Sequence, residues 1–110
     1  MNQGIQDVSA TLTATGTTLA TALQLLNAIN YVGTVASGTG VGLFPTNSGT
    51  PNPGIMQIVH NAGANALSVY PPSGMKINQI VASNPHLLAP NTACAYWTVS
   101  STQIVALLSA

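Results

Sequence analysis

Hydrophobic residues occur along most of the chain in short runs that are separated by Gly, Pro, Asn and Ser. From residue 29 onward these runs are rich in β-branched and aromatic residues, a pattern typical of β-strands. The expected strands are INYVGTV (29–35), VGLF (41–44), IMQIVH (55–60), ALSVY (66–70), MKINQIV (75–81), HLLA (86–89), TACAYWTV (92–99) and QIVALL (103–108). Such spacing predicts an all-β fold, either an antiparallel β-sandwich or a jelly-roll-like barrel. No period of the kind found in repeat proteins is visible.

The segments between these runs predict how the strands connect. NAGAN (61–65) is expected to be a five-residue hairpin loop in which Gly63 is free to adopt a positive φ. PPSG (71–74) then ends the hairpin, because proline cannot donate to a sheet ladder. Tyr70 directly precedes this break, where we expect an exposed aromatic side chain at a subunit contact. The proline-rich segment PTNSGTPNPG (45–54) is expected to be a loop.

The N-terminal quarter of the chain has the least regular pattern. Residues 1–18 are rich in Thr, Ser, Gly and Gln and predict an extended N-terminal arm, after which residues 19–110 form a single β domain. Residues 19–28 allow two interpretations. The spacing of a short amphipathic helix is met by Leu19, Ala22, Leu23 and Leu26. The overlapping segment LQLLNAINYVGTV (23–35) also fits a strand, so helix and strand both stay open.

The chain carries almost no charge. Asp7 is its only acidic side chain and Lys76 its only basic one, whereas about a quarter of the residues of a typical soluble domain are charged. Nucleic-acid binding through phosphate neutralisation needs several Lys or Arg side chains, so the composition argues against such a partner. A net charge near zero also favours association over dispersal. The surface therefore suits a protein that is packed against neighbours.

Few side chains in this sequence are capable of catalysis or metal binding. A Ser-His-Asp triad would require Asp7, and no nucleophile-elbow motif surrounds a serine. Cys94 with His60 or His86 is formally a nucleophile–base pair, but the apolar pattern around Cys94 favours a buried thiol. The spacings match no zinc signature, which leaves only a metal shared between subunits at a symmetry axis as an alternative. We therefore predict that the protein is not an enzyme and holds no cofactor or metal of its own.

The cysteine count and the apolar runs indicate in which cellular compartment the protein is used. A single cysteine, Cys94, cannot form an internal disulfide, and no Lys- or Arg-led apolar stretch indicates a signal peptide. The longest uninterrupted apolar run, IVALL (104–108), is too short to span a bilayer. We therefore expect a protein that is made and used without export or membrane insertion.

The order of several segments resembles that of small virion proteins encoded by tailed bacteriophages. The resemblance covers most of the chain and is carried by LTATGTTLATALQL (12–25), INYVGTVASGTGVGL (29–43), IVHNAGANALSVYPPSGMKIN (58–78) and AYWTVSS (95–101). Its most specific part is residues 61–78. The resemblance implies a β-rich, often jelly-roll-like fold and homo-oligomers seated on a shell, and it implies no catalytic residues. The chain departs from it where QIVALL (103–108) follows Trp97 as an additional strand, which pairs either within the fold or with a neighbour.

The resemblance implies a capsid decoration (cement) protein or another small head- or tail-associated structural protein. Of these we expect a decoration protein that stabilises the assembled phage head by bridging major capsid protein subunits. The implied partners are further copies of this chain, as a homotrimer rather than a dimer, and the major capsid protein or another virion protein, without nucleic acid or membrane. The implied location is the capsid surface of the virion, after synthesis in the cytoplasm of the bacterial host. The candidate subunit or capsid contacts are Ile5, Val8, Leu12, Phe44, Pro51, Tyr70, Pro71 and Pro72.

Two other interpretations stay open. The chain is alternatively a tail, portal-vertex or fibre component, which the number of copies per particle distinguishes from a decoration protein. In a different functional class, it is a glycan-binding module on the particle surface, because β-sandwiches often bind sugars through exposed aromatic side chains. The aromatic candidates for that role are Tyr31, Tyr70, Tyr96 and Trp97.

Overall fold

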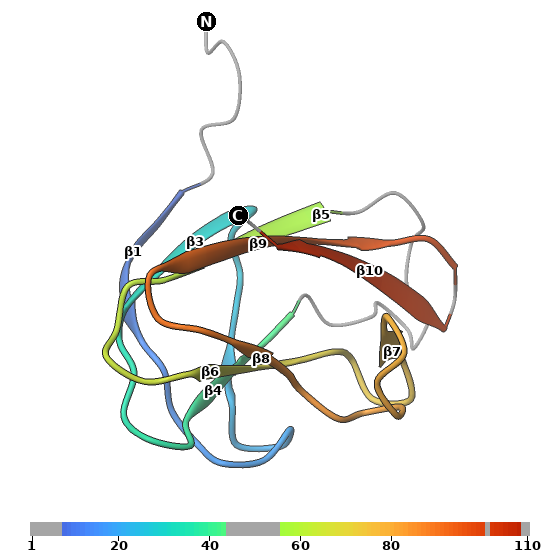
Figure 1. Ribbon diagram of the computed structural model, residues 1–110, viewed down its shortest axis with the longest axis horizontal. Helices are drawn as coiled ribbons and strands as arrows, with labels where there is room; N and C mark the ends of the chain where they lie inside the picture. Colours follow the sequence, from blue (N-terminus) through green and yellow to red (C-terminus); the bar gives the residue numbers. More distant parts are fainter. Residues whose placement is uncertain (1–7, 44–55, 101, 109–110) are drawn as a thin grey trace, which may run out of the picture.

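The computed structural model describes residues 8–43, 56–100 and 102–108, and within these ranges it contains strands, turns and loops but no helix. The strands form two layers (Figure 1). The larger sheet contains β1 (Val8–Thr13), β3 (Ile29–Thr34), β5 (Met56–Asn61), β7 (Lys76–Ile77), β9 (Thr92–Thr98) and β10 (Gln103–Leu108). The smaller sheet contains β2 (Leu23–Gln24), β4 (Gly40–Gly42), β6 (Leu67–Tyr70) and β8 (His86–Leu88). The predicted all-β fold is confirmed.

Both sheets are mixed, so the expectation of a purely antiparallel fold is wrong. The strand order is β1-β3-β5-β9-β10-β7 in the larger sheet and β2-β4-β6-β8 in the smaller one. β1, β3 and β5 are parallel, and so are β2, β4 and β6. Antiparallel pairing occurs where β9 joins β5 and β10, and where β8 joins β6. The additional C-terminal strand pairs within the fold, because β10 lies between β9 and β7.

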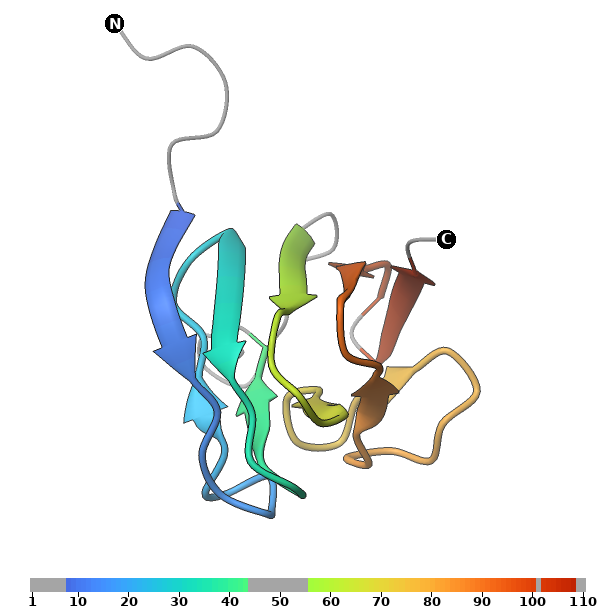
Figure 2. The ribbon, with the colours of Figure 1, turned by 60° about the vertical axis from the view of Figure 1, so that its left-hand side comes forward.

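The parallel pairing arises because the chain alternates between the two sheets. From β1 to β6, odd-numbered strands lie in the larger sheet and even-numbered strands in the smaller one, so successive turns of the chain stack side by side (Figure 2). For example, Val8 of β1 pairs with Ile29 of β3, and Ile29 pairs with Ile58 of β5. The number of residues between successive paired strands differs, because Val8 and Ile29 are closer along the chain than Ile29 and Ile58. This difference explains why the sequence shows no repeat period.

The predicted hairpin around NAGAN is wrong, since β5 and β6 lie in different sheets. This segment is a corner that carries the chain from one layer to the other. Asn61 is fully buried there, and its Nδ2 donates to the carbonyl oxygens of Asn65 and Leu88, both at 2.9 Å. Its Oδ1 accepts the backbone N–H of Gly63 at 2.9 Å. One amide side chain therefore satisfies three backbone groups of the corner.

Gly63 is required at this corner for a different reason from the one expected. The described glycines with positive φ are Gly16, Gly38 and Gly74, and Gly63 is not among them. A Cβ atom at Gly63 would come within 2.7 Å of the Cβ of Val35, closer than packed atoms approach. Close contact between two turns of the chain, rather than left-handed backbone, thus accounts for the glycine.

The core lies between the two layers and takes side chains from both. Val32, Val59, Cys94, Tyr96 and Ile104 contribute from the larger sheet, and Val41, Leu67, Val69 and Leu88 from the smaller one. Because side chains alternate across a strand, each of these inward positions is flanked by outward ones. Burial of one such aliphatic side chain stabilises the fold by about 1.5–3 kcal/mol.

The N-terminal segment contributes structure to this core. Residues 8–13, which belong to the predicted arm, form β1, and Leu12 packs against the core cluster. The helix considered for residues 19–28 is absent, and a turn at residues 18–22 leads into β2 instead. In that turn the Oγ1 of Thr21 accepts the backbone N–H groups of Thr17 and Thr18. Threonine hydroxyls that bind nearby backbone groups favour turns over helix.

The predicted strand at residues 75–81 is much shorter in the structure. Only Lys76 and Ile77 are extended, as β7, which pairs with β10. Asn78 follows with a φ of 51°, and Ile80 donates its N–H back to the carbonyl oxygen of Ile77 at 3.0 Å. The left-handed conformation of Asn78 therefore ends the strand in a turn.

Candidate assembly surface

Reactive side chains come together where the partly buried His86 meets Tyr96 and Cys94 of the core. The Nδ1 of His86 lies 2.8 Å from the phenol oxygen of Tyr96, and the two rings meet edge to face. Burial raises the pKa of Tyr96 and of the Cys94 thiol, and it lowers the pKa of His86. All three groups are therefore neutral near pH 7, and the cluster lacks the thiolate that a nucleophilic cysteine needs.

His60 lies on the other side of the larger sheet. It pairs with Ala93 while its neighbour Val59 pairs with Cys94, so His60 points outward where Cys94 points into the core. The structure thus separates the His60–Cys94 pair that the sequence allowed. Among the described residues, no cluster of three or more His, Cys, Asp or Glu side chains is placed to hold a metal ion. The described ranges also contain no helix with the length and hydropathy needed to cross a membrane.

The outer face of the larger sheet is almost entirely apolar. The outer side of the larger sheet includes Gly33, Gln103 and Lys76 of β7, which pairs with Gln103. We define the outer face by the other outward residues of β3, β5, β9 and β10, namely Ile29, Tyr31, Met56, Ile58, His60, Ala93, Ala95, Trp97, Val105 and Leu107. Each of these side chains is partly or largely exposed, with Leu107 63% and Tyr31 45% exposed. In an antiparallel pair with one solvated face, the outward positions are normally polar. Here both faces of the sheet carry apolar side chains.

The strand register arranges the outer face in rows that cross the sheet. Ile29 pairs with Ile58, Ile58 with Ala95, and Ala95 with Leu107, which gives one continuous aliphatic row across four strands. Within this region, a shallow apolar hollow is lined by Ile58, Ala93, Cys94, Ala95, Leu107 and Leu108. The short alanine side chains of β9 leave the hollow between the larger side chains of β5 and β10.

Aromatic side chains lie near both ends of the outer face. At one end the rings of Tyr31 and His60 are stacked, with centroids 5.4 Å apart and planes 7° from parallel. Toward the other end Trp97 pairs with Met56 and with Val105. The described residues of β3, β5, β9 and β10 include no Asp, Glu, Lys or Arg side chain. The outer face is therefore largely apolar, with the imidazole of His60 at one end.

The smaller sheet differs because the chain covers the outer side of β4 and β6. All residues of β4 and β6 are buried, including the outward Ser68 and Tyr70. The ring of Tyr70 lies over Gly40, where an added Cβ would be 2.8 Å from its Cε2 atom. The Tyr70 hydroxyl donates to the carbonyl oxygen of Thr17 at 3.0 Å, which holds the turn before β2 against the sheet. Tyr70 is therefore a buried structural residue, contrary to the exposed aromatic expected from the sequence.

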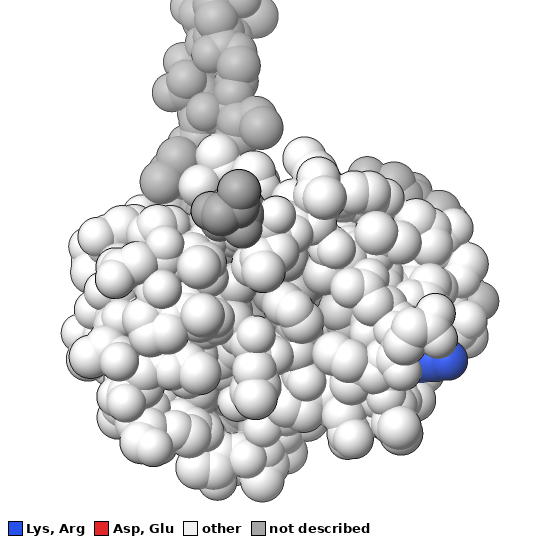
Figure 3. Space-filling model, in the orientation of Figure 1, with Lys and Arg blue, Asp and Glu red and all other residues white. Residues whose placement is uncertain are grey.

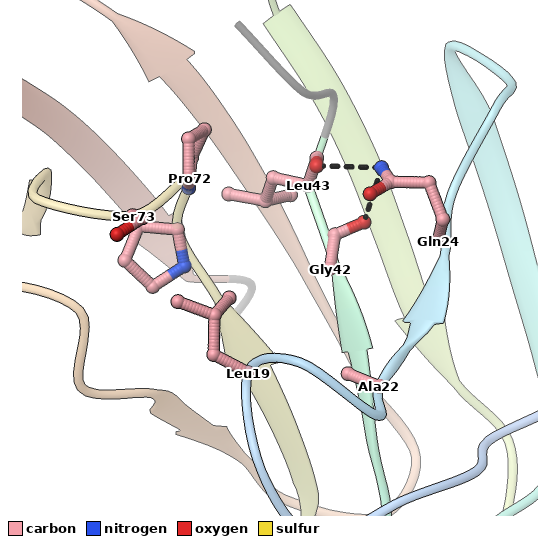
Figure 4. A pocket seen from close by; sticks show the side chains of 8 residues that line it. Leu19, Ala22, Gln24, Gly42, Leu43, Pro72 and Ser73 are labelled. Atoms are coloured by element: carbon pink, nitrogen blue, oxygen red, sulfur yellow. Dashed lines mark hydrogen bonds between the residues drawn. The ribbon is translucent and has the colours of Figure 1, made fainter. Parts of the chain in front are cut away.

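A second hollow lies beside the proline pair at the end of the smaller sheet (Figure 4). Its lining consists of Leu19, Ala22, Gln24, Gly42, Leu43, Pro71, Pro72 and Ser73. The Gln24 side chain donates its Nε2 hydrogens to the carbonyl oxygens of Leu43 at 2.7 Å and Gly42 at 3.3 Å. The amide nitrogen that lines this hollow is thus engaged by the backbone, and the lining contains no charged side chain.

The candidate contact residues named from the sequence fall into several environments. Ile5, Phe44 and Pro51 lie outside the described residues. Val8 belongs to β1, Leu12 packs on the core, and Tyr70 and Pro71 are buried. Pro72 is partly exposed beside the second hollow. Of the aromatic residues considered for glycan binding, Tyr96 and Tyr70 are buried, whereas Tyr31 and Trp97 lie at separate ends of the outer face.

The sequence-based analysis missed the outer face, although a signal for it was present. QIVALL and IMQIVH contain apolar residues at outward as well as inward positions. Near-continuous apolar runs of this kind are typical of strands covered on both faces. In QIVALL, Val105 and Leu107 point outward while Ile104 and Ala106 point toward the core. The apolar run QIVALL was therefore a signal that the outward side of this strand is also suited to contact with other apolar groups.

The surface of the described residues is almost uncharged (Figure 3). In that view a single blue area, from Lys76 at β7, lies at the edge of the molecule. Comparison of the chain with protein-family models, with curated proteins and with solved structures gave no match in any of the three.

Proposed function

We propose that this chain is a structural protein of a tailed-bacteriophage virion, and specifically a capsid decoration protein that binds the assembled head. The observation that carries the proposal is the exposed and largely apolar outer face of the larger sheet, on which β3, β5, β9 and β10 present no Asp, Glu, Lys or Arg side chain. Contiguous exposed apolar patches mark interaction sites in soluble proteins. The resemblance of residues 61–78 to small virion proteins supports the choice of particle.

The proposed mechanism is binding that is linked to assembly. A protein that binds the assembled shell and not the separate major capsid subunits stabilises the shell by mass action. Hydrophobic burial and backbone hydrogen bonds supply the attraction, because the chain has one acidic and one basic side chain. The protein bridges adjacent capsid subunits and needs no catalytic residue or cofactor. Packing of its two layers as a β-sandwich, in a homo-oligomer on the capsid surface, is part of this proposal.

The number of copies per purified particle tests this proposal. Hundreds of copies, measured by quantitative mass spectrometry against the major capsid protein, are expected for a decoration protein. A handful to a few dozen copies would instead assign the chain to the tail, the portal vertex or a fibre. Absence from purified particles would contradict a virion function altogether.

The N-terminal segment supplies a second test of the same proposal. β1 begins at Val8, so removal of residues 2–7 leaves every described strand in place. If these residues contact the shell, the shortened protein folds normally but no longer binds particles that lack it. Unchanged occupancy on such particles would remove the arm from the proposed contacts.

A further inference from the structure

We infer that acid pH releases β8 locally from the fold, because protonation of His86 weakens its contact with Tyr96. β8 lies in the smaller sheet and Tyr96 belongs to β9 of the larger one, so this contact joins the two layers (Figure 1). The release is a property of the chain itself and does not require the proposed virion function.

Few contacts hold β8 to the fold. It is the edge strand of the smaller sheet, so it pairs with β6 on one side only, over three residue pairs. Within residues 84–90, which include β8, Leu88 is the one buried side chain. Segments with few buried apolar contacts are those that open at low free-energy cost. One further contact, between His86 and Tyr96, therefore has a large share in keeping β8 closed.

Both ends of this segment are fixed to the rest of the chain. Ser83 donates its N–H to the carbonyl oxygen of Met75 at 2.9 Å, and Asn91 donates its N–H to that of Asn61 at 2.7 Å. Ser83 and Asn91 have φ values of 67° and 62°, in the left-handed region that is less favourable for residues with a Cβ atom. Such backbone is often found at switch segments. Residues 84–90 thus form a short span between two anchored positions, which allows it to open while its neighbours stay folded.

The contact depends on the protonation state of His86. The side chain points inward, because His86 pairs with the buried Val69, and its Nδ1 lies 2.8 Å from the phenol oxygen of Tyr96. Tyr96 is 2% exposed, and burial raises the pKa of its hydroxyl, which therefore donates to the neutral imidazole. An imidazolium has no lone pair on Nδ1 and cannot accept this hydrogen bond.

The surroundings of His86 contain no group that would stabilise its charged form. From β9 the titratable groups are Tyr96 and Cys94, whose pKa values burial raises, so both stay neutral near pH 7. From β6 the inward neighbour is the apolar Val69, whereas Tyr70 lies on the outer side. The described ranges contain no Asp or Glu side chain. A partly buried imidazolium is therefore less favourable than one in water, and protonation favours the open position of β8.

The direction of the effect follows from the pKa of His86. Burial lowers this pKa while β8 is closed, so the closed form binds fewer protons than the open form. Closure is fully favoured above about pH 6.5, the pKa of an exposed histidine, and weakens as the pH falls below that value.

Hydrogen exchange of the purified full chain, followed by NMR and corrected for the intrinsic effect of pH, tests the release. We expect the amides of β8 to be at least about threefold less protected at pH 5 than at pH 7.5, while protection in β3 and β5 stays unchanged. The two histidines provide matched variants. His86→Gln should abolish the pH dependence, and His60→Gln, on the outer face, should leave it intact. Circular dichroism verifies that both variants are folded.

Three results would overturn the inference. These are equal protection of β8 at both pH values in the wild type, a loss of protection that is as large in β3 and β5 as in β8, or an unchanged pH dependence in folded His86→Gln. The wild type alone decides the matter if His86→Gln does not fold. The midpoint of the exchange change must then coincide with the NMR titration of the His86 imidazole, and a midpoint that follows His60 instead contradicts the release.

Discussion

Amide and hydroxyl side chains hold the turns and corners of this protein, where many soluble domains use charged residues. Asn61 satisfies three backbone groups at the corner between β5 and β6, and Gln24 donates to the backbone at the end of β4. Tyr70 bonds the backbone at Thr17. Neutral groups pay a smaller desolvation penalty on burial than charged ones. Specific polar contacts are therefore compatible with a chain that has almost no charge.

Replacement of Asn61 tests the importance of one such contact. Asn61→Ala leaves the Leu88 and Asn65 carbonyl oxygens and the Gly63 N–H without this partner. We expect the free energy of unfolding to fall by about 2–3 kcal/mol, because buried polar groups without partners are costly. Urea denaturation measures the change, with the exposed Asn84→Ala as the control that should stay within about 0.5 kcal/mol of wild type. Equal effects of both substitutions would refute the assigned role of Asn61.

The buried His86–Tyr96–Cys94 cluster predicts a limited pH range of stability. Burial lowers the pKa of His86, so below about pH 6.5 the unfolded chain binds more protons than the folded one and stability falls with pH. Burial raises the pKa values of Cys94 and Tyr96, so above about pH 8.5 the unfolded chain releases protons more readily and stability falls as pH rises. Urea midpoints measured across this range should be highest between these limits.

A variant separates the two sides of this pH profile. His86→Gln keeps a hydrogen-bonding partner for Tyr96 but cannot take up a proton, so the loss of stability at acid pH should shrink while the alkaline loss remains. If His86→Gln loses as much stability at acid pH as the wild type does, another group causes the effect and the role of His86 is contradicted.

At the scale of elements, β1 links the N-terminal segment to the folded domain. It pairs in parallel with β3, and Leu12 packs against the core. The ladder contains two register irregularities, one between Val8 and Thr11 and one between Leu12 and Thr13. Such irregularities twist an edge strand and disfavour its pairing with other chains. β1 is thus a structural edge strand, and association through the face of the sheet is favoured over association through this edge.

Two deletions test the contribution of β1 to stability. Removal of residues 2–7 spares the strand, whereas removal of residues 2–12 deletes most of it together with Leu12. We expect the shorter deletion to leave the thermal unfolding temperature within about 2 °C of wild type and the longer one to lower it by at least about 8 °C, because strand pairing and a core contact are lost. A longer deletion that unfolds like wild type would show that β1 is dispensable.

At the scale of the whole molecule, the two sheets present different surfaces. In the smaller sheet β4 and β6 are buried and Leu87 of β8 is exposed, whereas the outer face of the larger sheet is largely apolar and exposed. The only charged side chain among the described residues is Lys76, which lies at the edge of the larger sheet on β7. The proposed association would therefore depend on hydrophobic burial, with very little electrostatic steering.

For the proposed attachment to a particle, the lack of charge predicts a weak dependence on salt. Occupancy of particles by the protein should change less than about twofold between about 50 mM and about 500 mM NaCl, because screening acts on charge–charge attraction and not on apolar contact. Quantitative mass spectrometry of particles pelleted at each salt concentration measures the occupancy. Release of the protein at moderate salt would contradict an apolar attachment.

Local patterns predicted the strands well and their arrangement poorly. The runs at residues 29–35, 92–99 and 103–108 form β3, β9 and β10, because period-two alternation and β-branched residues are local signals. The segment NAGAN predicted a hairpin, since a short glycine-containing loop between two strands is the usual signature of one. The structure places β5 and β6 in different sheets, because the parallel contacts of β5 with β3 and of β6 with β4 compete with a local hairpin.

The sequence by itself determined that this protein is all-β and almost uncharged, because these properties follow from composition and local alternation. Only the tertiary structure decided that the sheets are mixed, that Tyr70 is buried, and that Met56, Ile58 and Leu107 share one exposed face. Sheet order and strand register join residues that are far apart along the chain. No local pattern specifies these pairings, so the candidate assembly surface becomes visible only in the folded molecule.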